Sequence, residues 1–302
     1  MLCFAATSFI FINIFNSACL SFSLNEYELR QSFMNMQLGL PTISSVLPTT
    51  SPKVLRIVTF NVGRFSQSLS SNVDSPGTSY SPSQSSPSPF QSSPSTSPSS
   101  SFNRIRNDLL VLSADVIALQ EIDRFQRRYF VSQMMGGGGG FQSLSCQYGE
   151  DREMLLLISK RLVMKSRKTL YFMDRCVILA DIWFQNKRIR VANVHLSHML
   201  RRLRNPRQLN NVMERLINSC QGPDFQSIIA GDFNMKDPLA AVSDNTTAFR
   251  YLYRPGKGEF SHWRGFTVDH ILGTGAISVL KGGFLQQTAS DHSLLYLDLT
   301  LQ

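Results

Sequence analysis

The sequence predicts an α+β protein in which two mixed β-sheets pack face to face and helices cover their outer faces, a four-layer α/β/β/α sandwich. Apolar runs of strand length recur along the chain, and neighbouring runs are joined as hairpins more often than through helices. Strict alternation of strands and helices would instead indicate one parallel sheet. With 302 residues, 42% of them hydrophobic, the chain is long enough to bury a core between two such sheets.

The first half of the expected domain contains three strands and one helix. Apolar runs with polar ends predict strands at 53–61 and 116–120. Between them, the segment 102–112 has its apolar residues at helical spacing. A continuous apolar run predicts a buried strand at 154–159.

The second half contains a hairpin, a helix and three further strands. The segments 176–184 and 188–195 flank the polar turn 185–187, which is typical of a hairpin. A helix is predicted at 206–219, because apolar residues recur there at spacings of three and four: Leu209, Val212, Met213, Leu216 and Ile217. Short apolar runs predict strands at 228–231, 267–272 and 294–299.

The N-terminal segments differ in composition from the expected domain at 53–302. Residues 1–22 are apolar and uncharged, which indicates a signal peptide or an organellar leader. A membrane anchor is less favoured, because Asn13 and Asn16 interrupt the apolar run. The leader thus indicates a secreted or an organellar protein without choosing between them, and residues 23–52 have the composition of a tether.

A Ser/Pro-rich insert at 66–101 interrupts the domain. It contains 18 Ser and 6 Pro among 36 residues, and its one charged residue is Asp74. Such a composition buries too little apolar surface to offset the entropy lost on ordering, so we expect disorder there. A phosphorylated or partner-binding arm is one interpretation, and neutral low-complexity expansion is the other.

The cysteines indicate neither a zinc site nor a disulfide framework. Cys3 and Cys19 lie in the leader, which leaves Cys146, Cys176 and Cys220 in the domain, without C-x-x-C spacing. Buried free thiols are therefore the expectation.

The net charge of +9 is concentrated in one stretch. Eight basic residues lie between 187 and 215: Lys187, Arg188, Arg190, Arg201, Arg202, Arg204, Arg207 and Arg215. A basic face favours nucleic acid as a partner, with anionic lipid as the alternative, although a solvated helix face has the same composition. We expect Arg201, Arg202 and Arg204 to bind substrate. The sequence indicates no protein partner, and we expect a monomer.

Polar side chains stand at the ends of several predicted strands. Asn61, Glu121, Asp232 and His292 each lie beside an apolar run, at the edge of a predicted sheet. Carboxylate and amide oxygens are the ligands that Mg²⁺ prefers, which makes Asn61 and Glu121 candidate metal ligands. Asp232 and Asn234 are two residues apart, so on one strand they would face the same side. Asp232 would orient or deprotonate a water, and Asn234 would donate to a phosphate.

Six segments together resemble the endonuclease/exonuclease/phosphatase superfamily of metal-dependent phosphoesterases, whose fold is DNase I-like. In the family's order they are Thr59-Phe60-Asn61-Val62, Ala118-Leu119-Gln120-Glu121, Ala192-Asn193-Val194-His195-Leu196, Ala230-Gly231-Asp232-Phe233-Asn234, Val268-Asp269-His270-Ile271-Leu272 and Ser290-Asp291-His292. Each segment is weak alone, but six in order, each beside a strand, are specific. The histidine in the third segment is similar to the deoxyribonuclease I, sphingomyelinase and deadenylase branches.

The resemblance implies further roles in the site. Asp269 is implied as the carboxylate partner of His292, and Asp291 as another metal ligand. His195 is implied as a second imidazole that donates to a phosphoryl oxygen or to the leaving group. Either Asp232 or the Asp269–His292 pair would act as the base, and the metal would be Mg²⁺, with Mn²⁺ as the alternative.

These observations predict a Mg²⁺-dependent phosphodiester hydrolase that acts on nucleic acid by in-line attack of water. A phospholipid or inositol-phosphate esterase of the same superfamily is one alternative, since the apolar leader and basic face would also suit a membrane. A catalytically silent module that binds polyanions is the other. The sequence does not distinguish DNA from RNA, or endo- from exo-cleavage.

Overall fold

A computed structural model describes residues 53–63, 98–135, 140–149, 152–172, 174–198, 206–242, 248–286 and 290–302. The chain divides into the units Met1–Pro48 and Thr49–Gln302, and all described residues belong to the second unit. The predicted leader and tether, most of the Ser/Pro-rich insert, and Arg201, Arg202 and Arg204 lie outside the described residues.

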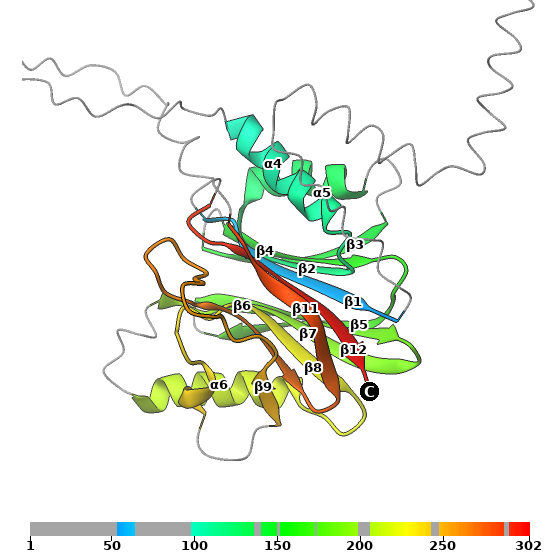
Figure 1. Cartoon of the computed structure of the whole chain (residues 1–302), viewed down its shortest axis with the longest axis vertical. Helices are drawn as coiled ribbons and strands as arrows, with labels where there is room; N and C mark the ends of the chain where they lie inside the picture. Colours follow the sequence, from blue (N-terminus) through cyan, green and yellow to red (C-terminus); the bar gives the residue numbers. More distant parts are fainter. Residues whose placement is uncertain are drawn as a thin grey trace, which may run out of the picture. The chain divides into compact units, whose positions relative to one another are not determined.

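Two six-stranded sheets form the centre of the second unit (Figure 1). The first sheet has the order β11 (Ile277–Leu285), β12 (Leu294–Leu301), β1 (Leu55–Asn61), β2 (Val116–Asp123), β4 (Arg152–Ser159) and β3 (Phe141–Tyr148). The second has the order β5 (Val163–Phe172), β6 (Arg175–Phe184), β7 (Lys187–His195), β8 (Gln226–Asp232), β10 (Asp269–Thr274) and β9 (Phe249–Tyr251). Both sheets are mixed, because β1 pairs with β2, and β7 with β8, in parallel, whereas the other pairs are antiparallel.

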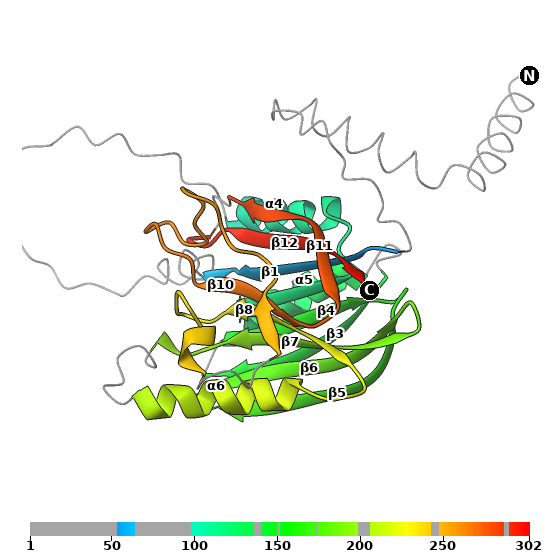
Figure 2. The same cartoon turned by 60° about the horizontal axis from the view of Figure 1, so that its bottom comes forward.

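Helices cover the outer faces of both sheets, as predicted. Figures 1 and 2 show α4 (Pro98–Val111) and α5 (Arg124–Met135) over the first sheet, and α6 (Pro206–Cys220) under the second. A short 3-10 helix, Leu239–Ala241, follows β8. The four-layer α/β/β/α sandwich expected from the sequence is therefore confirmed.

Alternation along each strand divides the apolar side chains between two cores. Ile57 and Ala118 of the first sheet and Val191 and Ala230 of the second lie between the sheets. Their neighbours along the second sheet, such as Ile229, face outward and pack with α6. Each strand therefore presents every second residue to the intersheet space, and its last inward-facing residue lies at the sheet edge.

The structure adds elements that the sequence pattern did not predict: α5, β3, β5, β9 and β11. The edge strand β5 is polar along most of its length, with most of its residues exposed, so it lacks the apolar alternation of an inner strand. Helix α4 begins at Pro98, inside the segment 66–101 that we expected to be disordered. Proline is well tolerated in the first turn of a helix, which explains why the Ser/Pro composition does not prevent helix formation at this point.

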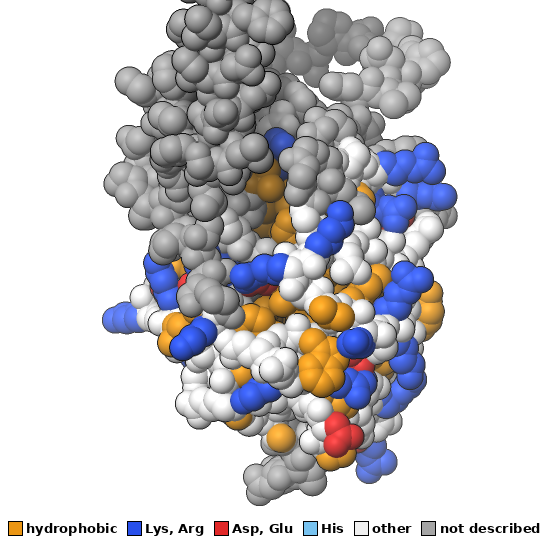
Figure 3. Space-filling view, turned by 90° about the vertical axis from the view of Figure 1, so that its right-hand side faces the viewer, with side chains coloured by type: hydrophobic (Ala, Val, Ile, Leu, Met, Phe, Trp, Pro, Cys, Tyr) orange, Lys and Arg blue, Asp and Glu red, His pale blue; other side chains and the backbone are white. Residues whose placement is uncertain are grey.

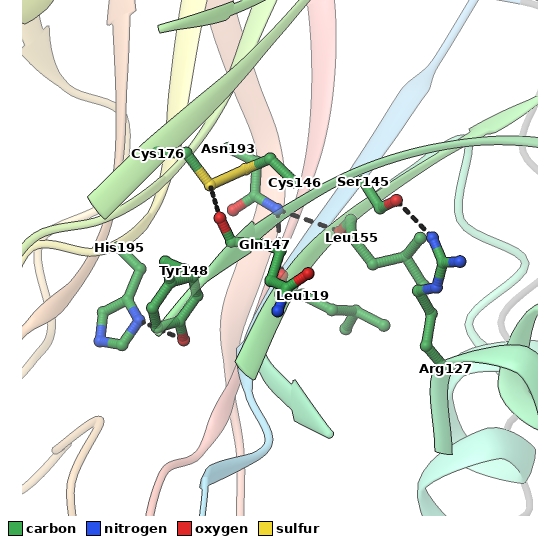
Figure 4. The surroundings of a disulfide bond; sticks show 10 residues. All are labelled: Leu119, Arg127, Ser145, Cys146, Gln147, Tyr148, Leu155, Cys176, Asn193 and His195. Atoms are coloured by element: carbon green, nitrogen blue, oxygen red, sulfur yellow. Dashed lines mark hydrogen bonds between the residues drawn. A yellow bond between two sulfur atoms is a disulfide. The ribbon is translucent and has the colours of Figure 1, made fainter. Parts of the chain in front are cut away.

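The expectation of free thiols was wrong for two of the three described cysteines. Cys146 of β3 and Cys176 of β6 form a disulfide with a Cα–Cα distance of 6.4 Å (Figure 4). Cys220 is free and buried. The bond joins a strand of the first sheet to a strand of the second, 30 residues later in the chain. Spacing rules detect cysteines that are close in sequence, whereas this pair meets because β3 packs across β6.

The surface carries the basic charge expected from the sequence. On the face shown in Figure 3, Lys and Arg side chains are spread widely and few carboxylates lie among them. Among the helices of the described residues, none combines the length and the apolar character needed to cross a membrane.

Candidate active site

The centre of the site is a buried cluster of His292, Asp269 and Asp232. Asp269 begins β10 and lies opposite Asp232, which ends the antiparallel neighbour β8. His292 Nδ1 lies 2.8 Å from Asp269 Oδ2, and its Nε2 lies 3.9 Å from Asp232 Oδ2. The sequence predicted all three residues, and the structure places them within one cluster.

Electrostatics in this cluster favour a charged imidazole. Burial disfavours the cation, but the carboxylates of Asp269, Asp232 and Asp291 outweigh it and raise the pKa of His292 to about 10. Burial, followed by the negative charge of Asp269, raises the pKa of Asp232. Asp232 is therefore a more basic carboxylate than usual, and it lies beside a proton donor.

A glycine allows Asp232 to reach this position. Gly231 has a φ of 151°, and a Cβ there would lie 1.9 Å from the carbonyl oxygen of Val194 on β7. No side chain fits into that space, so glycine lets β8 lie close to β7. Parallel pairing then sets His195 beside Asp232.

Asn61 connects Asp232 to the carboxylate of Glu121. Its Nδ2 donates to Asp232 Oδ2 at 2.9 Å and lies 3.5 Å from Glu121 Oε1. Its Oδ1 accepts the N–H of Gly63 at 2.9 Å. The two predicted ligands Asn61 and Glu121 thus lie together at the ends of the neighbouring strands β1 and β2.

A backbone irregularity orients Glu121. The pairing of β2 with β4 shifts register between Leu119 and Ile122, and Glu121 has a positive φ of 57°. Gln120, which precedes it, faces the intersheet space and donates to Asn193 Oδ1 at 2.8 Å. Simple alternation would turn Glu121 to the opposite face, but the bulge brings it to the same side as Gln120.

Asn193 of β7 stabilises this bulge from the other sheet. Its Nδ2 donates to the carbonyl oxygens of Leu119 and Leu155, each at 3.0 Å. These bonds satisfy buried carbonyl groups at the point where the β2–β4 pairing becomes irregular. The family-like segment at 192–196 therefore contributes a structural amide as well as His195.

Three oxygens converge on the space beside Gly63 and fit a divalent metal. A Cβ at Gly63 would lie 3.2 Å from Asn61 Oδ1, 3.4 Å from Asp291 Oδ1 and 3.4 Å from Glu121 Oε2. Two carboxylates and one amide suit Mg²⁺, and the predicted ligand set Asn61, Glu121 and Asp291 is therefore together in space. The group Asp232, Asp269 and His292 is also compact, but there the imidazole is paired with Asp269 and its positive charge opposes a cation.

His195 is a second, differently charged imidazole. Its Nε2 lies 3.5 Å from Glu121 Oε1 and 3.7 Å from Asp232 Oδ2. Burial, followed by the positive charge of Arg175, lowers the pKa of His195 well below its usual value. The site therefore combines a neutral imidazole at 195 with a charged one at 292.

Asn234 lies beyond the strand on which we placed it. β8 ends at Asp232, and Asn234 follows in a turn with a positive φ of 54°. Its backbone N–H donates to Asp232 Oδ1 at 2.7 Å, and its Nδ2 donates to the carbonyl oxygen of Leu196 at 2.9 Å. The turn, rather than strand alternation, brings Asn234 next to Asp232.

The first three basic residues of the stretch do not lie beside His195. Lys187, Arg188 and Arg190 lie toward the start of β7, the opposite end of the strand from His195. Asp181 accepts hydrogen bonds from Arg188 at 2.6 Å and from Arg190 at 2.7 Å. This part of the stretch is partly neutralised, so the proposal of a phosphate-binding face now concerns the later arginines.

Sequence reasoning missed several residues at the site. Arg152 at the start of β4 pairs with Glu121 and lies 3.4 Å from the Gly63 carbonyl oxygen. His262 Nε2 lies 3.7 Å from Asp291 Oδ2, and its ring packs edge-on against His292. Tyr148 contacts His195. His262 lies outside the six family-like segments, and a lone Tyr or Arg at a strand end carries no motif.

Comparisons with solved structures identify the fold. The D. rerio TDP2 structure complexed with single strand DNA product has a TM-score of 0.58 and 12% identity, covering 82% of this chain and 99% of that one. The structure of the human Nocturnin catalytic domain with bound sulfate anion has a TM-score of 0.59 and 17% identity. The match covers 83% of this chain and 94% of that one. The structure of the mannosyl-6-phosphatase of Bacteroides thetaiotaomicron has a TM-score of 0.59 and 12% identity. The match covers 82% of this chain and 100% of that one. At these identities the likeness shows the fold alone.

The family is established by sequence. A comparison with curated protein sequences found no match. The profile of the Endonuclease/Exonuclease/phosphatase family, whose members are phosphoesterases, matches residues 58–292. This span begins in β1 and ends at His292. It contains all the candidate metal ligands and catalytic residues described above, from Asn61 to His292. The chain belongs to the endonuclease/exonuclease/phosphatase family.

Proposed function

We propose that this protein is a Mg²⁺-dependent phosphodiesterase that hydrolyses nucleic acid. The observation that carries the proposal is the convergence of three metal-type oxygens beside Gly63 with the buried Asp232–His292–Asp269 cluster. Phosphodiester hydrolysis needs a water nucleophile, neutralisation of phosphoryl charge and protonation of the leaving oxygen. The cluster offers a group for each requirement.

The roles divide by charge and by hydrogen bonding. Mg²⁺ at Asn61, Glu121 and Asp291 would neutralise charge on the phosphoryl oxygens. Asp232 accepts the proton of the attacking water as its oxygen forms the new bond to phosphorus. His292, held as a cation by Asp269, gives a proton to the leaving oxygen as the old P–O bond breaks.

Charge supports nucleic acid as the substrate class. The chain carries a net charge of +9, and a fold neighbour, D. rerio TDP2, is complexed with single strand DNA product. We propose that Arg201, Arg202 and Arg204 contact the phosphate backbone. Replacing all three with Ala should weaken DNA binding and flatten its dependence on salt concentration. Unchanged salt dependence would remove these arginines from the substrate-binding surface.

A substrate panel tests the function directly. The purified chain is incubated with single-stranded DNA, RNA, phosphatidylinositol phosphate vesicles, sphingomyelin vesicles and a sugar monophosphate, with Mg²⁺, Mn²⁺ or EDTA. We expect release of acid-soluble nucleotides that requires Mg²⁺ or Mn²⁺ and is abolished in Asp232→Asn. Release of phosphocholine or orthophosphate in place of nucleotides would assign the lipid or monoester alternative. Binding of DNA without turnover of any substrate would assign the silent module.

We also propose that the chain matures in an oxidising compartment. The Cys146–Cys176 disulfide supports this, because such bonds persist where thiols are not kept reduced. The apolar leader expected at 1–22 agrees with it. Mass spectrometry of the protein from its native cells, after blocking of free thiols, checks the proposal. Alkylated Cys146 and Cys176 would contradict it.

A further inference from the structure

A buried tyrosine contacts the neutral imidazole of the site. The hydroxyl oxygen of Tyr148, at the end of β3, lies 3.0 Å from His195 Nδ1 (Figure 4). The two rings meet edge to face at a centroid distance of 5.5 Å. Both residues are buried, so this hydrogen bond does not compete with bulk water.

The direction of this hydrogen bond follows from the other contact of the hydroxyl. The Tyr148 oxygen also accepts a hydrogen bond from the backbone N–H of Glu121. With its oxygen already accepting from Glu121, the O–H of Tyr148 is free to donate, and the acceptor within reach is His195 Nδ1.

The opposite edge of the imidazole agrees with that assignment. His195 Nε2 faces Glu121 Oε1 at 3.5 Å and Asp232 Oδ2 at 3.7 Å. A protonated Nε2 is attracted to these carboxylates, whereas a lone pair there would be repelled by them. The Nε2–H tautomer therefore suits both edges of the ring, whereas the other tautomer would set the Nε2 lone pair against the two carboxylates.

We propose that Tyr148 is a positioning residue that fixes His195 as the Nε2–H tautomer and aims this N–H into the active site. A neutral histidine otherwise exchanges between two tautomers, and only the Nε2–H form presents a donor to a phosphoryl or leaving oxygen beside Asp232. The inference concerns the site of the proposed function and rests on that function for its kinetic readout alone.

Two further contacts hold Tyr148 in place. The guanidinium of Arg175, on β6, lies over the Tyr148 ring with its Cζ 4.4 Å from the centroid. Cys146, two residues before Tyr148, is bonded to Cys176, the residue after Arg175. Figure 4 shows the disulfide and Tyr148, with His195 of β7 beside the tyrosine ring. The cross-link thus fixes the end of β3 against β6, where the tyrosine meets the histidine.

Nitrogen NMR of the histidine side chains tests this inference without reference to activity. In the ¹⁵N-labelled full chain, with and without Mg²⁺, we expect His195 to show a protonated Nε2 and an unprotonated Nδ1. His270 serves as an internal reference, since its Nε2 lies 2.9 Å from the Met235 carbonyl oxygen, away from Tyr148. A protonated Nδ1 on His195 in the wild-type chain would overturn the inference, even if the variants described next do not fold.

Variants separate positioning from packing. In Tyr148→Phe the ring remains but the hydroxyl is lost, so the His195 signals should shift toward a mixture of tautomers while those of His270 stay unchanged. Nuclease kcat should fall about 10- to 100-fold with KM nearly constant. Tyr171→Phe, at a tyrosine that is 67% exposed, is the matched control and should change neither readout. Unchanged His195 signals in a folded Tyr148→Phe would refute the inference, whereas a wild-type chain without nuclease activity would refute only the proposed function.

Discussion

His292 Nδ1 and Asp269 Oδ2 lie 2.8 Å apart, and both side chains are buried at the edge where the two sheets meet. The pair comes from different elements: Asp269 opens β10, and His292 precedes β12 of the other sheet. A charge pair that is removed from water is strong and fixes the orientation of the imidazole.

Asp269→Asn should therefore reduce catalysis without unfolding the protein. The amide cannot stabilise a cationic His292, and we expect kcat to fall on the order of 10²- to 10⁴-fold, the range of general acid catalysis. Steady-state kinetics with a DNA substrate measure the loss, and circular dichroism checks the fold. Asp224→Asn, at an exposed position before β8, is the control and should retain full activity. Full activity in Asp269→Asn would exclude this pair from the reaction.

Glu121→Gln should weaken metal binding at the oxygens beside Gly63. The substitution removes one of the two negative charges there, and we expect the Mg²⁺ concentration for half-maximal activity to rise on the order of 10- to 100-fold. Calorimetric titration of Mg²⁺ into the chain should show the same weakening. Glu214→Gln on the outer helix α6 is the comparison variant and should bind Mg²⁺ like the wild type. Equal Mg²⁺ affinity in Glu121→Gln and wild type would place the metal elsewhere.

Loss of the Cys146–Cys176 bond should destabilise the protein. The bond spans 30 residues, and closure of such a loop contributes about 3 to 4 kcal/mol through the unfolded state. We expect the double variant Cys146→Ser/Cys176→Ser to lose stability of this order in urea unfolding. Dithiothreitol should destabilise the wild type by a similar amount and leave the double variant unaffected. A wild type that is insensitive to the reductant under unfolding conditions would contradict the expectation.

Asp181 should make stability depend on pH in the acid range. Although burial acts in the opposite direction, hydrogen bonds from Arg190 and Arg188 hold the pKa of Asp181 well below its usual range. A carboxylate with a lowered pKa stabilises the fold above its unfolded pKa, about 3.9, and this contribution disappears as the pH falls through the folded pKa.

Asp181→Asn should thus cost about 2 kcal/mol in the free energy of unfolding at neutral pH. The difference from the wild type should shrink as the pH falls below about 4, because the Asp181 carboxylate of the unfolded wild type then becomes protonated. Urea unfolding at neutral and acid pH measures both values, and Asp224→Asn should match the wild type throughout. A difference that is constant with pH would mean that the charge of Asp181 is not what stabilises the fold.

Apolar runs in the sequence predicted the sandwich, and the polar residues at their ends predicted most of the buried polar cluster. Asn61, Asp232 and Asp269 lie where apolar runs stop, and pairing of the strands brings those ends together. Edge strand β5 escaped prediction because an exposed, charged strand has no apolar alternation. Glu121 was found from its motif, but its direction depends on a bulge that alternation does not predict.

Contacts between the sheets were beyond the reach of sequence. Tyr148 meets His195, and Cys146 meets Cys176, because β3 lies across from β6, a relation that depends on how two complete sheets are stacked. Arg152 was missed for a related reason within one sheet, because its pairing with Glu121 follows from the register of β2 with β4. No spacing rule within one strand carries that information.

Gly63 has no side chain at the point where three oxygens of the site come close together. A methyl group there would lie 3.2 Å from Asn61 Oδ1, closer than most Cβ contacts, and 3.4 Å from one oxygen each of Glu121 and Asp291. The added carbon would occupy the space beside these oxygens, while the acidic and imidazole groups stay in the chain. Among chains with the same polar strand ends, the residue at this position is therefore one to compare between those that hydrolyse and those that only bind.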